Sequence, residues 1–341
     1  MAADIDRPFL EAVGNTPLIR LRCASEQTGC AIFGKAEFMN PGGSVKDRAA
    51  KYILLDAFRR GVLRTGGTVV EGTAGNTGIG LTLAGNALGV RTIIVMPETQ
   101  AIEKRSALLG MGAELRLVPA APYKDSNNYV HQACRLAEEL AGSVPGGVFY
   151  ANQWDNRANR EGHTASTGPE IWRQTDGKID AFICAVGTGG TLAGVAEYLK
   201  QRKPGIVTAA ADPDGAAIYH WVKHGELKAS GSSITEGIGL GRVSGNLEGA
   251  KIDDAFNIPD REWVPVLWEL ISEEGLYVGG STGLNVAGAI RLARQLGPGH
   301  TIVTMLNDSA RTYESKLFNR EFLESRGLPP PPWLQGASLS R

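Results

Sequence analysis

Residues 180–191 read DAFICAVGTGGT, an apolar run followed at once by a turn that contains three glycines. A short, nearly continuous apolar run of this kind is typical of a strand buried on both faces of a parallel sheet. Glycines directly after the strand let the backbone turn sharply and approach a ligand closely. With a helix expected over 191–201, the stretch predicts one strand–turn–helix unit of an α/β fold.

The same alternation of strands and helices continues on both sides of this stretch. Before it, we expect strands over 68–71, 91–96, 114–118 and 148–151 and helices over 76–88, 102–111 and 129–140. After it, we expect strands over 206–211 and 301–306 and helices over 262–274 and 284–296. Two such series predict an α/β fold with two domains, each a mostly parallel twisted sheet flanked by helices. Residues 212–260 show too little periodicity to assign.

The overall composition excludes several classes of protein. Of 341 residues, 43% are hydrophobic and 21% are charged, as in ordinary globular proteins. The net charge of −1 argues against a nucleic-acid or membrane surface. The four cysteines form no C-x-x-C pair, so we expect no metal site, no disulfide framework and a reducing, cytoplasmic location. No apolar run of about 18 residues and no signal-peptide pattern is seen.

The segment 40–48, NPGGSVKDR, places a lysine at an unusual position. Its proline and glycines predict a turn, and Ser44 can cap a helix expected to run through 49–58. Lys46 would then lie in the first helical turn, where the helix dipole disfavours a cation and lowers the pKa of the amine. A neutral amine is what Schiff-base chemistry requires. For this segment alone, a solvated lysine beside Asp47 is an equally good interpretation.

A second glycine-rich segment, GTAGNTG at 72–78, directly follows the strand expected over 68–71. In a loop between a strand and a helix, several backbone N–H groups point at one spot, which suits a carboxylate. The hydroxyls of Thr73 and Thr77 and the amide of Asn76 add further donors. The alternative is a tight turn that only caps the helix.

Two more glycine-rich segments each open an expected helix. The turn Gly187-Thr188-Gly189-Gly190-Thr191 suits a phosphate. It is neither a dinucleotide fingerprint, because Leu192 stands where a glycine is needed, nor a Walker A loop. In the segment 279–283, GGSTG, Ser281 can be a helix cap, or it can donate a hydrogen bond to a pyridine nitrogen.

Together these four segments resemble the cysteine synthase / cystathionine β-synthase family of pyridoxal-phosphate enzymes, and cysteine synthase most of all. The blocks PGGSVKDR, TAGNTG, GTGGT and GGSTG occur in the order and spacing of that family, from VGNTPL at 13–18 to about Asp308. The segments 152–154 and 236–239 also match positions around the family's cleft. The resemblance implies fold type II, as in the tryptophan synthase β subunit, with pyridoxal 5′-phosphate in the cleft between the domains.

The resemblance also implies a role for each matching residue. Lys46 would hold the cofactor as a Schiff base and be the catalytic acid and base. Further cofactor contacts would come from Asn76, Gly187, Thr188, Gly189, Gly190, Thr191 and Ser281. The substrate carboxylate would be bound by Thr73, Ala74, Gly75, Thr77 and Gln153. Ala74 departs from the family, which usually has a serine there, so one hydroxyl donor is missing.

The domain boundaries and associations follow from the same comparison. Residues 1–40 with 156–326 would form the larger, cofactor-binding domain, and 41–155 a smaller mobile domain that carries the carboxylate loop. Residues 327–341, rich in proline and then polar, would form an extended tail. A homodimer is implied, and the expected partners are a small amino acid, sulfide or a thiol, and serine acetyltransferase.

The activity that the resemblance implies is β-replacement, in which L-cysteine forms from O-acetylserine and sulfide through an aminoacrylate intermediate. Cystathionine formation or cysteine desulfhydration would use the same groups. A non-catalytic protein that binds a peptide carboxylate is less favoured, because such a protein needs no Schiff-base lysine. A nicotinamide dehydrogenase that uses the 187–190 turn with Asp212 would leave PGGSVKDR unexplained.

Overall fold

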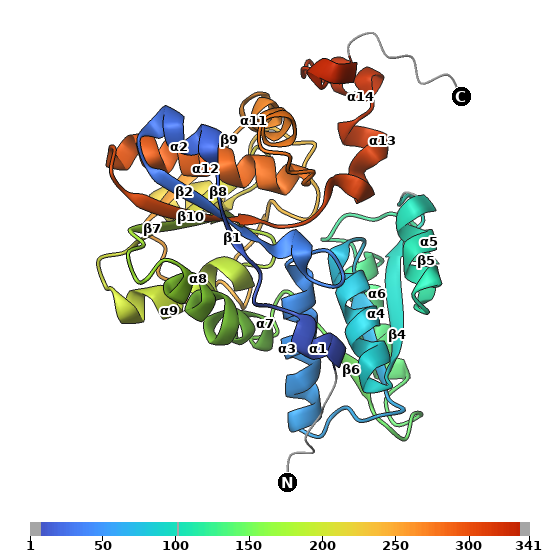
Figure 1. The fold of residues 1–341 in the computed structure, drawn as a ribbon. Helices are drawn as coiled ribbons and strands as arrows, with labels where there is room; N and C mark the ends of the chain where they lie inside the picture. The colour runs from blue at the N-terminus through green and yellow to red at the C-terminus, as the bar shows by residue number, and fades with distance from the viewer. Residues whose placement is uncertain (1–7, 101, 335–341) are drawn as a thin grey trace.

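The computed structural model describes residues 8–100 and 102–334, and these residues build two separate sheets (Figure 1). The six-stranded sheet has the order β1-β2-β10-β7-β8-β9. Its strands are β1 (Leu18–Arg20), β2 (Ala31–Ala36), β7 (Ala181–Ala185), β8 (Val207–Pro213), β9 (Asp254–Ile258) and β10 (Thr301–Leu306). All neighbours in it are parallel except β1 and β2. The sheet is covered by helices on both faces, which confirms the predicted α/β class.

The second sheet has four parallel strands in the order β5-β4-β3-β6. Its strands are β3 (Thr68–Gly72), β4 (Arg91–Pro97), β5 (Glu114–Val118) and β6 (Val148–Tyr150). Side chains alternate between its faces, so Val69 packs beneath α3 (Lys46–Arg59) and α4 (Asn76–Leu88). Val70 packs instead against α6 (Tyr129–Glu139). The strand and helix regions predicted between residues 68 and 151 are thus present.

The same alternation explains why β7, a central strand of the larger sheet, is apolar throughout. Ile183 of β7 faces α11 (Asp260–Ser272), α12 (Gly280–Leu296) and α2 (Arg22–Thr28). Its neighbour Phe182 faces α8 (Gly168–Gln174), α9 (Gly190–Arg202) and α10 (Ile218–His224). Because both faces are buried, the strand contains no polar residue.

Close contact between α3 and α4 fixes the start of α3. A side chain on Gly80 would have its Cβ only 3.0 Å from the main-chain oxygen of Lys46. Any larger residue at position 80 would be tightly crowded against the first turn of α3. The two helices therefore hold the lysine at a defined place beside the four-stranded sheet.

Several predicted boundaries were wrong. Helix α3 begins at Lys46, so this lysine lies in the first turn as predicted, but the cap position is Val45 and not Ser44. Helix α12 begins at Gly280 rather than at 284, so Ser281 lies within its first turn and is not its cap. The region 212–260, which the sequence left unassigned, contains α10 and β9. Among the described residues, no helix has the length and apolarity needed to span a bilayer.

The remaining elements are short. They are α1 (Pro8–Ala12), η1 (Glu37–Met39), α5 (Ile102–Gly110), α7 (Ala158–Gly162), η2 (His163–Thr167), η3 (Ala310–Tyr313), α13 (Glu314–Leu317), α14 (Arg320–Ser325) and η4 (Pro332–Leu334). Beyond residue 326, Leu328 is buried, and the indole nitrogen of Trp268 donates a hydrogen bond to the Pro329 carbonyl at 3.0 Å. Residues 335–341 of the predicted tail lie outside the described residues.

Candidate active site

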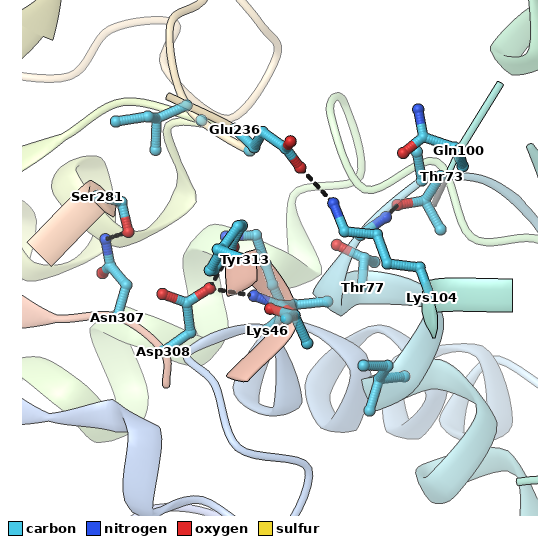
Figure 2. Close-up of a pocket in the computed structure, with 18 of the residues that line it drawn as sticks. Lys46, Thr73, Thr77, Gln100, Lys104, Glu236, Ser281, Asn307, Asp308 and Tyr313 are labelled. Atoms are coloured by element: carbon cyan, nitrogen blue, oxygen red, sulfur yellow. Dashed lines mark hydrogen bonds and ion pairs between the residues drawn. The ribbon is translucent and has the colours of Figure 1, made fainter. Parts of the chain in front are cut away.

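A cavity of about 560 Å³ lies where the loops after β3, β7 and β10 meet the first turns of α3 and α12. The carboxyl ends of parallel strands open into this space, which is where α/β sheets place their ligand sites. Figure 2 shows side chains from both sheet units converging on it, with Lys46 and Asp308 close together. The cavity therefore joins the two parts of the molecule.

Lys46 is the first residue of α3 and lines this cavity. Its backbone N–H donates to the Ser44 hydroxyl at 3.2 Å, and the preceding Val45 N–H donates to the Asn307 carbonyl at 2.9 Å. The side chain is open to the cavity but shielded from bulk water. This desolvation lowers the pKa of the amine, while the charge of Asp308 acts in the opposite direction. The pKa is therefore lowered, which is the predicted direction, but the cause is burial and not the helix dipole expected from the sequence.

The turn after β7 faces the same lysine. A smaller cavity of about 20 Å³ is lined by Lys46 together with Gly187, Thr188, Gly189 and Thr191. Gly187 must lack a side chain, because its Cβ would lie 2.6 Å from the Gly237 carbonyl. Gly190 lines neither cavity; it packs against Asn159, whose Oδ1 would lie 2.4 Å from an added Cβ.

The loop after β3 forms another wall of the larger cavity, which Thr73, Ala74, Gly75, Asn76 and Thr77 all line. The Thr77 hydroxyl donates to the side-chain oxygen of Gln153 at 2.6 Å. Gln153, which follows β6 in the chain, also lines the cavity, so the structure brings together the residues predicted to bind a carboxylate.

Asp308 was missed by the sequence analysis as a site residue, although the resemblance ended there. Its Oδ2 accepts hydrogen bonds from the Asn76 amide at 2.6 Å and from the Tyr313 hydroxyl at 2.5 Å. Burial raises the pKa of this carboxyl, while the hydrogen bonds and Lys46 oppose that shift. Ser281 lies nearby, where its hydroxyl accepts from the Asn307 amide at 3.1 Å. No glycine-rich motif marks Asp308, Asn307 or Tyr313 in the sequence.

Charged residues also lie at the edge of the cavity, and of these only Glu236 belongs to a segment that the sequence placed near the cleft. Glu236 accepts hydrogen bonds from both Lys104 of α5 and Lys316 of α13 (Figure 2 shows the Lys104 bond). The Lys104 amine also lies 5.4 Å from the centre of the Tyr313 ring. Elements distant in sequence supply these three partners, so only the folded chain reveals the cluster.

The predicted dinucleotide alternative fails on Asp212. This carboxylate is fully buried and does not line the cavity. It accepts a hydrogen bond from the Tyr219 N–H at 2.8 Å, in the first turn of α10. A residue used in this way is not available to a ribose. Among the described residues, no group of three or more histidine, cysteine or acidic side chains could hold a metal ion.

Comparisons with known proteins agree with this geometry. A family model described as "Pyridoxal-phosphate dependent enzyme" matches residues 9–308. Cysteine synthase 1 of Neurospora crassa is 51% identical over 332 residues, which cover 96% of this chain and 87% of that one. Cysteine synthase 1 of Emericella nidulans is 50% identical over 323 residues, which cover 93% of this chain and 86% of that one.

A comparison with solved structures agrees with these sequence similarities. The crystal structure of O-ureido-L-serine synthase superposes with a TM-score of 0.82 at 32% identity, covering 98% of this chain and 96% of that one. Both the long matched region and these similarities exceed what a shared α/β architecture alone would produce. The chain belongs to the family of pyridoxal-phosphate dependent enzymes.

Proposed function

We propose that this protein makes L-cysteine from O-acetylserine and sulfide. The observation that carries the proposal is the position of the Lys46 amine, whose pKa is lowered by burial, at the wall of a cavity shared with two glycine-rich turns. Half of the residues are identical to those of two fungal cysteine synthases over nearly the whole chain, which supports this choice of reaction.

The residues around Lys46 fit pyridoxal phosphate. The small cavity joins the amine to the 187–191 turn, and Gly187 and Gly189 line it together with Lys46. The turn opens α9, a helix of 13 residues whose N-terminus favours a phosphate. We assign Gly187, Thr188, Gly189, Gly190 and Thr191 to the phosphate, Ser281 to the ring nitrogen and Asn76 to the ring oxygen. Gly190 would contribute through its backbone alone.

The side chains of this protein would then divide the work of β-replacement. When bound, pyridoxal phosphate supplies an electron sink for negative charge at the substrate Cα. Lys46 removes the proton from Cα and returns it after acetate has left Cβ and sulfide has been added there. Thr73, Gly75, Thr77 and Gln153, with the backbone at Ala74, hold the substrate carboxylate. Charge at Asp308 would steady Lys46 when the amine carries the proton.

The domain organisation predicted from the sequence becomes part of this proposal. Residues 41–155 include the four-stranded sheet and the carboxylate loop, while 1–40 and 156–326 include the larger sheet and the phosphate turn. Closure of the smaller part over a bound substrate would keep water from the reaction. A homodimer and an association with serine acetyltransferase stay predictions from the resemblance, and a cytoplasmic location stays a prediction from the cysteine content.

The direct test is a reaction assay on the purified, cofactor-loaded protein. We expect O-acetylserine and sulfide to give cysteine and acetate in equal amounts. Serine with homocysteine, and cysteine alone, are the comparison substrates for the two related activities. Turnover of either comparison substrate at a higher kcat/KM than O-acetylserine would replace the proposed reaction with that one.

Thr77→Val tests the carboxylate loop. Valine keeps the shape of threonine but removes the hydroxyl that contacts Gln153 and would bind the substrate. We expect the KM for O-acetylserine to rise about tenfold, which corresponds to about 1.4 kcal/mol, with a smaller change in kcat.

Thr82→Val in the same helix is the matched control. The Thr82 hydroxyl is also buried, but it donates to the Gly78 carbonyl and does not line the cavity. We expect its KM to stay near that of the wild type. Equal KM values for the two variants would remove Thr77 from the proposed site.

A further inference from the structure

Glu71 is a buried acid directly behind the proposed carboxylate site. It lies near the end of β3, two residues before Thr73, and is fully buried. Among residues 8–100 and 102–334, no lysine, arginine or histidine forms an ion pair with it. It accepts hydrogen bonds from the backbone N–H and the side-chain amide of Gln153, each 3.3 Å from one of its oxygens, and from the backbone N–H of Asn152. Buried acids without a cationic partner favour their uncharged form.

Gln153 connects this acid to the cavity. Its amide nitrogen donates to Glu71, and its amide oxygen accepts the short hydrogen bond from Thr77. The preceding Asn152 has a φ of 47°, a backbone conformation that needs support from its surroundings. Glu71 therefore fixes the orientation of two groups that line the proposed carboxylate site.

In the described residues no cation faces Glu71, and its N–H donors, which lower its pKa, are outweighed by burial. The titratable groups that face it are the phenols of Tyr129 on α6 and Tyr150 on β6, and burial raises the pKa of both, so they stay neutral. Burial also raises the pKa of Glu71 to about 8. Because charges interact strongly in a poorly solvated region, an ionised Glu71 would repel a carboxylate bound just beyond Gln153.

We propose that Glu71 is a positioning residue that must be uncharged for Gln153 and the 73–77 loop to hold the substrate carboxylate. The inference rests on the proposed function, in which those residues bind that group. Above about pH 8, the enzyme would lose affinity for its amino-acid substrate as Glu71 ionises, while the chemistry at Lys46 is otherwise intact.

The test compares the wild type with Glu71→Gln, a neutral side chain of the same shape. The dissociation constant of L-alanine, which has no leaving group on Cβ, is measured from the change in cofactor absorbance at pH 7 and pH 9. Titration of the alanine amine affects both proteins equally and cancels in their ratio. At pH 9 only about a tenth of Glu71 would be uncharged. We therefore expect the ratio of the wild-type to the variant dissociation constant to rise about tenfold from pH 7 to pH 9.

A second acid on the same sheet provides the control. Glu114 of β5 is partly exposed and paired with Arg91, so Glu114→Gln should keep the wild-type pH dependence. A ratio for Glu71→Gln that is the same at both pH values would overturn the proposal. A large loss of alanine affinity in Glu71→Gln at pH 7 would also overturn the proposal. Such a loss would show that the charged form of Glu71 supports binding.

The proposal can also be tested on the wild type alone, should Glu71→Gln fail to fold. Propionate carries a carboxylate and no group that titrates between pH 7 and 9. Its inhibition constant against the amino-acid substrate should rise about tenfold over that range, and an unchanged constant would contradict the proposal. Because alanine binding is read without turnover, it separates this inference from a failure of the proposed reaction.

Discussion

Lys46→Ala is expected to lower the rate of cysteine formation by about 10⁴-fold or more. The variant loses the amine that would move the proton at the substrate Cα, and proton transfer by a positioned group alone contributes 10²–10⁴-fold in enzymes. The same amine is proposed to anchor the cofactor, so both of its contributions disappear together. Steady-state assays with O-acetylserine and sulfide measure the effect.

Two features of this variant make the result specific. The 187–191 turn is unchanged, so we expect the variant to bind pyridoxal phosphate but to release it on dialysis. Lys51→Ala is the control, because Lys51 lies in the same helix but donates to the Val13 carbonyl at 3.2 Å, away from the cavity. A Lys46→Ala protein with rates comparable to Lys51→Ala would show that the amine has no part in the reaction.

Arg48→Met is expected to cost about 3–5 kcal/mol of the free energy of unfolding. The Arg48 guanidinium is fully buried between Glu37 and Glu170, to which it donates hydrogen bonds of 2.7–2.8 Å. Methionine would fill the space but leave two buried acids with Lys35 as the one remaining cation of this cluster. Urea unfolding followed by circular dichroism measures the loss.

The acid dependence of stability provides a second measure of this cluster. Arg48 and Lys35 hold the pKa of Glu170 at about 2, below the usual value of about 4.3, although burial alone would raise it. The cluster therefore stabilises the wild type above about pH 4, and this contribution is lost as the pH falls toward 2. We expect the free energy of unfolding of Arg48→Met to fall less than that of the wild type over that pH range.

Arg59→Met is the control for the stability prediction. Arg59 also belongs to α3, but its ion pair with Asp56 is exposed, so its loss should cost at most about 1 kcal/mol. An unfolding free energy for Arg48→Met within that small range would contradict the role given to the buried cluster.

The local pattern was sufficient to predict much of the fold. Strands β3, β4, β7 and β8 each contain an apolar run, and each was placed within two residues of its observed ends. Helix boundaries were less accurate, because α12 begins with Gly280, Ser281, Thr282 and Gly283, which are weak helix formers. Packing of Gly280 and Gly283 against Trp263 stabilises that first turn, and this contact is invisible in the sequence.

The unassigned region shows a different reason for failure. Strand β9 has the sequence DAFNI, which includes two polar residues in five and lies at the edge of the larger sheet. Its pairing with β8 supplies the order that its side chains do not signal. Helix α10 has only seven residues, too few for a periodic pattern to stand out.

The residues of the candidate site also fall into two groups, those that local motifs predicted and those that only the fold reveals. Glycine-rich segments that open helices predicted Lys46, the 73–77 loop and the 187–191 turn, because their chemistry is local in sequence. Glu71 contacts Gln153, which is 82 positions away in the sequence, and Asp308 contacts Asn76, which is 232 positions away. Only the fold brings these pairs together. Gly190 shows the opposite case, in which a motif residue faces a packing partner instead of the cavity.

Borohydride reduction followed by peptide mass spectrometry tests most directly whether the amine of residue 46 holds the cofactor. Reduction fixes pyridoxal phosphate to whichever amine carries it, and digestion then isolates that peptide. We expect the phosphopyridoxyl group on Lys46 and on no other lysine. Its recovery on a different lysine, or cofactor that washes away entirely after reduction, would contradict the account.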